Sequence, residues 1–307
     1  MGLISDIVDW LADQVQTTTG EKDRRQWVYK LKEEFERFKT MVVEIIDRIN
    51  VAITDFNQHI KRLNYLRTET VFQSIDKLGS SLQCLGNLKP PGEYIAESEK
   101  IPAELPMQNL EKKADYINEV DWSRQDVEFN TFFLTPFGMM AKTRKQNLSM
   151  QEQLNEMKLE FENTKRILEL REYNTRQDTI ICELYIECVD TICKIVQEVI
   201  IPEFELIEAF WRAIAVKNIV ISEAPEAEVT SKRNIVLLKD TIYHKHYIFA
   251  KNAFLFYVMS CKIYDTPVLT RMLNHTLQDG DQEMMENHKN ILSLQANALC
   301  QNSISRL

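Results

Sequence analysis

The sequence predicts an all-α protein, an elongated helical bundle built on two long amphipathic helices, with a minor short strand left open as an addition. Three observations lead to this prediction. The 307 residues include only seven glycines, and a fold rich in tight turns needs more residues that adopt positive φ. Apolar residues recur alternately four and three positions apart over 24–67, and again over 140–201. That spacing is typical of one face of an α-helix.

The first long helix is predicted over 21–85. Its apolar stripe keeps the four-and-three spacing for five heptads, as a coiled-coil seam does. The stripe comprises Leu31, Phe35, Phe38, Val42, Ile45, Ile49, Ala52, Phe56, His59, Leu63 and Leu66. The stripe is wider than a two-stranded seam, which favours burial in a bundle; the residues that widen it are Trp27, Ile46, Ile53 and Ile60. Gly86 is the predicted stop signal.

A proline-rich linker is predicted over 86–108, because proline breaks the helical hydrogen-bond pattern. Its breakers are Pro90, Pro91, Gly92, Pro102 and Pro106. Residues 109–307 are predicted to form a helical bundle that begins with a short helix over 110–120. Residues 126–134 are ambiguous between a short strand and an irregular apolar segment.

The second long helix is predicted over 140–201, and Pro202 is predicted to kink or end it. Its stripe comprises Met150, Leu154, Met157, Phe161, Thr164 and Leu168, then Ile181, Leu184, Cys188, Ile192, Ile195 and Val199. The pattern predicts further helices over 204–221, 232–264, 266–275 and 282–303.

The composition narrows the classes of partner and compartment. A net charge of −9 disfavours nucleic acid, which needs a basic surface. The six cysteines form no CxxC pair, so we expect reduced thiols. Asp6, Asp9 and Asp13 interrupt the N-terminal apolar stretch, which argues against a secretory signal. We therefore expect a cytoplasmic protein, with a peripheral membrane position as the alternative.

Local catalytic signatures are missing from the sequence. It contains no phosphate-binding glycine loop, no GxSxG and no HExxH. We therefore predict no catalytic residue, no cofactor and no metal site. His244 and His246 share a face only on a strand, and the surrounding residues favour a helix. His59 occupies a seam position, where a histidine serves either as a structural residue or as a pH-dependent switch.

The first candidate contact region is an amphipathic helix predicted over 1–16. Its apolar face carries Leu3, Ile4, Ile7, Val8, Trp10 and Leu11. The opposite face is acidic, which is the wrong charge for anionic lipid. Docking on protein is therefore favoured over insertion into a membrane interface.

The second candidate contact region is an uncharged apolar tip over 129–141, too short to span a bilayer. Its contact residues are Phe132, Phe133, Phe137, Met139 and Met140, followed by the basic residues Lys142, Arg144 and Lys145. This arrangement fits either a membrane contact or a connection packed against the bundle.

The sequence favours a non-catalytic helical interaction or assembly protein that acts through long helix faces. Its partner would be another protein or a second copy of the chain. The alternative is a membrane-active α-helical protein, pore-forming or membrane-remodelling, that contacts lipid through 1–16 or 129–141. An enzyme whose site is assembled from scattered helix residues is the third hypothesis.

Overall fold

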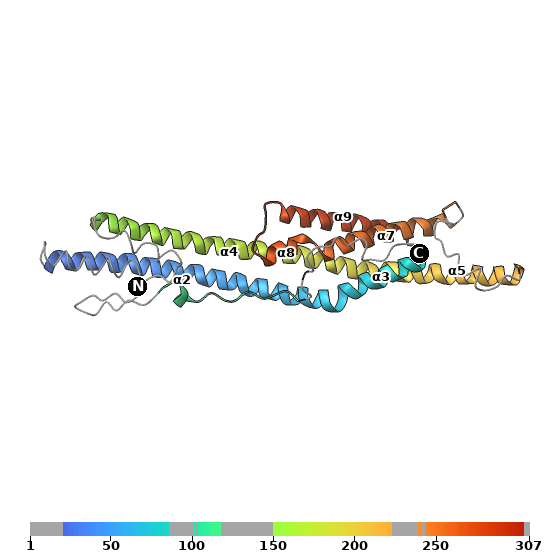
Figure 1. The fold of residues 1–307 in the computed structure, drawn as a ribbon, viewed down its shortest axis with the longest axis horizontal. Coiled ribbons are helices and arrows are strands. Elements are labelled where there is room, and N and C mark those ends of the chain that lie inside the picture. The colour runs from blue at the N-terminus through green and yellow to red at the C-terminus, as the bar shows by residue number, and fades with distance from the viewer. Residues whose placement is uncertain are drawn as a thin grey trace. The chain divides into compact units, whose positions relative to one another are not determined.

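A computed structural model describes residues 21–85, 101, 104–117, 150–222, 239–240 and 243–303, and the described residues are all-α without a strand. The predicted fold class is confirmed, and the ambiguous segment 126–134 lies outside the described residues. The helices, coloured along the chain in Figure 1, are α2 (Glu21–Tyr65), α3 (Phe72–Leu85), α4 (Met150–Ile195), α5 (Ile201–Ser222), α7 (His244–Tyr264), α8 (Pro267–Leu273) and α9 (Asp281–Asn302).

The chain forms two compact units, and both long helices contribute to each. The first unit comprises residues 1–56 and 108–177, and the second comprises 57–107 and 178–307. The boundary between the units therefore falls within α2 and within α4. The predicted helix over 21–85 is present as one continuous run of helical turns, α2, the π-helical turn η1 (Leu66–Val71) and α3.

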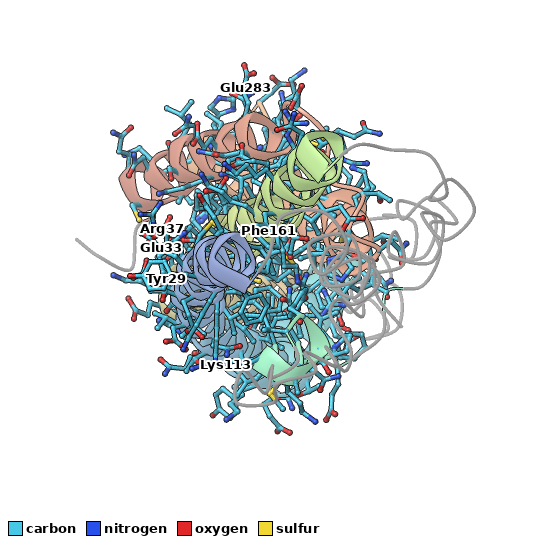
Figure 2. The ribbon with its side chains drawn as sticks, turned by 90° about the vertical axis from the view of Figure 1, so that its left-hand side faces the viewer. Tyr29, Glu33, Arg37, Lys113, Phe161 and Glu283 are labelled. Atoms are coloured by element: carbon cyan, nitrogen blue, oxygen red, sulfur yellow. The ribbon has the colours of Figure 1, made fainter. Side chains whose placement is uncertain are left out.

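In the first unit, α2 and α4 lie side by side and run parallel. Phe38 stacks on Phe161 with ring centroids 4.0 Å apart, and Figure 2 shows Phe161 directed toward α2. Farther along both helices, Arg48 Nε donates to Glu172 Oε2 at 3.0 Å. Because residue numbers rise together along the pair, the chain must return between the two helices by a long connection.

The predicted seam of α2 is buried in the first unit. Phe35, Phe38, Val42, Ile45, Ile49, Ala52 and Phe56 are each at most 5% exposed. On α4, the predicted stripe residues Phe161, Thr164 and Leu168 are also buried. Burying a large aliphatic or aromatic side chain contributes about 2 kcal/mol to stability. The seams therefore form the core within the chain.

In the second unit, α7 packs against α9 and α3, and α3 also packs against the π-helical turn η5 (Val196–Ile200) and α5. Phe249, Phe256 and Leu299 are fully buried in this core. Gly280 has φ +103°, a conformation that few residues other than glycine adopt, directly before α9. An ion pair between Arg271 and Asp281 closes the turn between α8 and α9.

A one-residue offset in the apolar pattern explains η1. The apolar pattern consists of two rows of buried residues. The first row is Ile49, Phe56 and Leu63, and the second is Val71, Leu78 and Leu85. Within each row the spacing is seven, but Leu63 and Val71 are eight apart. A π-turn bonds each N–H five residues back instead of four, so it accommodates one extra residue. Arg67, four residues after Leu63, faces the core, whereas Leu66, predicted in the seam, is only half-buried.

Of the two alternatives predicted at Pro202, a kink or an end of the second long helix, the end is wrong. The helix continues through η5 into α5 and ends at Ser222. Proline lacks an N–H and its ring clashes with the carbonyl four residues earlier in an α-helix. The wider turn η5 directly precedes Pro202, and π-turns are a known way to adjust a helix around such a residue. The predicted start over 140–149 lies outside the described residues.

The predicted short helix over 110–120 is also wrong as far as residues 110–117 are described. The chain is extended there apart from the 3₁₀ turn η3 (Lys113–Asp115). Glu111 gives both its N–H and its C=O to the side chain of Asn50. Those backbone groups therefore cannot join a helical ladder, and this contact with α2 outweighs the local helix propensity.

Deletion of Glu69, an exposed residue of η1, should be better tolerated than deletion of Asp47, an exposed residue of α2. The first deletion restores the spacing of seven and converts η1 into α-helix, whereas the second rotates the α2 seam by about 100°. We expect the Asp47 deletion to cost about 3 kcal/mol more in the free energy of unfolding, measured in urea. Equal losses would contradict this account of η1.

Candidate interaction surfaces and buried polar sites

Most residues singled out by the sequence lie outside the described residues. These are Leu3, Ile4, Ile7, Val8, Trp10, Leu11, Phe132, Phe133, Phe137, Met139, Met140, Lys142, Arg144 and Lys145. His59 is described: its side chain is 24% exposed and Nε2 lies 3.3 Å from Glu183 Oε1. The buried residue beside it is Ile60. The role of His59 as a switch stays a prediction.

The first-unit part of α4 carries a second apolar face that the sequence patterns did not reveal. Leu159, Ile167, Leu170 and Tyr173 are 62%, 42%, 57% and 59% exposed. At 100° per residue they fall within about 120° of the helix surface, roughly opposite Phe161 and Leu168. We call these four residues the outer stripe. The spacing of the buried stripe does not include these residues, whereas a helical-wheel projection of residues 159–173 places them together on one face.

Charged residues of both signs border one edge of the outer stripe. Glu162, Arg166 and Glu169 are exposed on α4, and none of them makes an ion pair with another described residue. By contrast, charged residues of α4 that lie closer to α2 form ion pairs within the first unit. Lys158, for example, pairs with Glu34 of α2 at 3.7 Å. The outer face therefore combines apolar side chains with available charges.

A second candidate surface lies where residues 108–117 contact both helices of the first unit. Asn50 Nδ2 donates to the carbonyl of Glu111 at 3.0 Å, and the N–H of Glu111 donates to Asn50 Oδ1 at 2.8 Å. One amide side chain thus pairs with both backbone groups of one residue, as a neighbouring β-strand would.

Side chains of α4 complete this surface, which we call the Asn50 site. Arg171 Nε donates to Glu111 Oε1 at 3.3 Å, and the hydroxyl of Tyr116 donates to Glu111 Oε2 at 3.0 Å. Burial and the Glu111 carboxylate together raise the pKa of Tyr116 to about 12, so the phenol stays a donor at neutral pH. Thr175 contacts Gln108 at 3.5 Å. The Asn50 site comprises Asn50, Arg171 and Thr175.

The second unit repeats the same backbone contact with a different asparagine. Asn64 Nδ2 donates to the carbonyl of Leu105 at 2.9 Å, and the N–H of Leu105 donates to Asn64 Oδ1 at 2.8 Å. Leu105 is buried. No sequence pattern marked these asparagines, since a partner 41 or 61 residues away is visible only in three dimensions.

Arg67 forms a buried polar site in the second unit. It is 1% exposed, and its Nη1 donates to the Tyr185 hydroxyl at 2.7 Å and to the Tyr264 carbonyl at 2.9 Å. Its guanidinium lies 4.4 Å from the Tyr264 ring centroid. Tyr264 is the last residue of α7, where unpaired carbonyls carry partial negative charge. Arg67 thus caps α7 and anchors it to η1.

Substitution of Arg67 by Ala should lower the free energy of unfolding by about 3 kcal/mol. The change removes both hydrogen bonds of Arg67 and leaves a cavity in the core, while the Tyr185 hydroxyl still donates to the Tyr264 carbonyl at 3.2 Å. Urea denaturation gives the measurement, and Arg37→Ala serves as the control because Arg37 is 66% exposed in an i,i+4 ion pair. Such exposed pairs contribute less than about 1 kcal/mol. Similar losses for both variants would contradict the role of Arg67.

A buried acid, a histidine and a serine meet at the end of α9. Glu203 is fully buried, accepts a hydrogen bond from Ser303 Oγ at 3.1 Å, and lies 3.8 Å from His246 Nδ1. Burial lowers the pKa of His246, and the Glu203 carboxylate opposes that shift. Burial, together with Lys262, also lowers the pKa of His288 on α9. The serine is bonded to the acid, so the three residues join α5, α7 and α9 without forming a nucleophile–base pair.

The lowered pKa of His288 predicts a loss of stability on acidification. Its contribution is complete above the unfolded pKa of about 6.5, and it is lost as pH falls below that value because the unfolded chain then binds the proton more readily. Between pH 7.5 and 5.5 the Tm of His288→Gln should therefore fall by about 1–2 °C less than that of the wild type. Parallel Tm curves for the two proteins would refute this reading.

The second unit also contains a groove between α3 and α5, with a cavity of about 290 Å³. It is lined by Lys77, Ser80, Ser81, Cys84, Leu85, Ile201, Phe204, Glu205, Glu208 and Trp211. The volume is at the lower end for small-molecule sites. Its lining contains apolar side chains together with one basic and two acidic residues.

The six cysteines, all described, are free thiols. Burial raises the pKa of Cys188 to about 12 and that of Cys261 to about 11, so both behave as small apolar side chains at neutral pH. In the part of the chain that the structure describes, no three His, Cys, Asp or Glu side chains form a metal-binding group. Nor does any described helix combine the length and the apolar character needed to cross a membrane.

Comparison with known proteins finds no relative. No protein-family model, no curated protein and no solved structure matches the chain.

Proposed function

We propose that this chain is a non-catalytic interaction protein that self-associates through the outer stripe of α4. The observation that carries the proposal is the two-faced character of this helix. Phe161 and Leu168 are buried within the first unit, while Leu159 and Leu170 are more than half exposed on the other side. Exposed apolar side chains aligned along one helix face suit a second amphipathic helix.

The size of the outer stripe indicates a weak association. Four large side chains at about half exposure present roughly 400 Å² of mostly apolar surface, which is at the level of patches that are often functional on monomers. Stable complexes bury about 800 Å² on each partner. We therefore expect a reversible dimer with a Kd in the micromolar range or above.

The charges beside the outer stripe favour a second copy as the partner. Two copies of one face pair most simply about a two-fold axis, which makes two helices antiparallel. With the axis between Arg166 and Glu169, each Arg166 lies opposite Glu169 of the other copy, and Ile167 of both copies lies near the axis. Neither charge is paired with a described residue in the monomer. Opposite charges across the axis would select this register.

Sedimentation velocity tests the proposal at protein concentrations up to about 200 μM, the range that resolves a weak dimer. The wild type should show a reversible dimer, and Leu159→Gln with Leu170→Gln should raise its Kd at least about tenfold, because apolar area is lost while helix propensity is kept. Leu294→Gln on α9 is the matched control, since Leu294 is 70% exposed outside the outer stripe.

Charge reversal then tests the register. Arg166→Glu and Glu169→Arg should each weaken the dimer, and the protein carrying both changes should recover it, because the pairs are restored with opposite sign. A wild type that stays monomeric over the whole concentration range would contradict the proposal. A dimer unaffected by the two glutamine substitutions would place self-association on another surface.

A further inference from the structure

Residues 108–117 bind the first unit as a peptide ligand would. Residues 108–112 have no regular secondary structure and lead into η3, and side chains of α2 and α4 hold the segment by hydrogen bonds without a sheet partner. Arg171 contacts Glu111, whereas Thr175, four residues later on α4, contacts Gln108. The segment therefore runs antiparallel to α4 across the Asn50 site.

The Asn50 site recognises backbone and charge separately. Asn50 bonds to the N–H and C=O of Glu111, groups that every residue except proline carries. Selection comes from Arg171, whose side chain is 28% exposed and whose guanidinium faces the carboxylate of Glu111, a side chain that is 20% exposed. An acidic residue at this position is favoured because a guanidinium hydrogen-bonds strongly to carboxylates.

The segment is fixed by few apolar contacts. Of residues 108–117, only Ile117 is buried, and Leu110 is 56% exposed. Segments with few buried apolar contacts open at a free energy well below that of global unfolding. The Asn50 site can therefore be vacated while α2 and α4 keep their buried seams.

We propose that the Asn50 site is a docking site for an extended peptide segment of another protein that carries one acidic residue opposite Arg171, and that residues 108–117 occupy the site as a built-in competitor. The partner segment supplies a glutamate or aspartate whose backbone pairs with Asn50 and whose carboxylate meets Arg171. The chain's own segment shows the mode of binding, in which main-chain hydrogen bonds give affinity and one side chain gives specificity. This surface is separate from the outer stripe, and the proposal is independent of self-association.

The test uses the full chain and a fluorescein-labelled peptide with the sequence of residues 108–117, with binding measured by fluorescence anisotropy. Glu111→Ala in the protein removes the competitor's contact with Arg171 and should tighten peptide binding about tenfold relative to the wild type. Adding Asn50→Ala to that variant should remove the gain. Asn302→Ala is the matched control, because Asn302 only bonds to Ala298 within α9.

A peptide change makes the test independent of protein folding. The peptide with glutamine in place of its glutamate should bind the Glu111→Ala protein at least about fivefold more weakly than the unchanged peptide. Hydrogen exchange at residues 108–117 should also be faster in Glu111→Ala than in the wild type, with the seam of α2 unchanged.

Two results would overturn the proposal. One is a Glu111→Ala protein that keeps its helical circular dichroism and binds the peptide no more tightly than the wild type. The other is peptide binding that depends neither on Asn50 nor on the peptide's glutamate, since such binding would not use the Asn50 site.

Discussion

The apolar rows of α2 and α3 are out of step by one residue, and the second unit depends on how the helix absorbs that offset. In a regular α-helix the step of eight residues would turn Val71 about 80° around the helix from Leu63. Both rows are buried on either side of the π-turn η1, and Arg67 within this turn lies in the core. A buried guanidinium needs acceptors, and the Tyr185 hydroxyl and the last carbonyl of α7 provide them. Arg67 thereby links η1 to the C-terminal end of α7.

In the first unit, the comparable constraint is the parallel direction of α2 and α4. A parallel pair needs a return connection, and residues 101 and 104–117 are the described parts of that return, of which 108–117 lie in the first unit. Asn50 and Arg171 bind it through polar contacts, which leaves Leu110 exposed and the apolar seams intact. The outer stripe lies on the other face of α4. The first unit thus offers two surfaces of different chemistry, one apolar and helical, the other polar and suited to extended chain.

The helices and their buried faces were predictable because hydrophobic periodicity is a local property. The spacing from Phe35 to Phe56 directly specifies the buried face of α2. The offset between Leu63 and Val71 was also present in the sequence, but it has meaning only once both rows are known to be buried. The prediction of a helix over 110–120 was wrong because helix propensity depends only on residues nearby in the sequence, whereas Asn50, the partner of Glu111, lies 61 residues away.

By itself the sequence determined the all-α class, the long helix over 21–85 and most of the seam residues that are buried in the described chain, since these follow from apolar spacing. His59 and Leu66, also predicted in the seam, are only half-buried. Tertiary structure decided the rest: the parallel pairing of α2 with α4, the passage of the helix through Pro202, the contacts of Asn50 and Arg67, and the exposure of Leu159 and Leu170. Each of these depends on which distant segment lies alongside. Periodicity assigns a residue to a helix face, and only packing decides what that face meets.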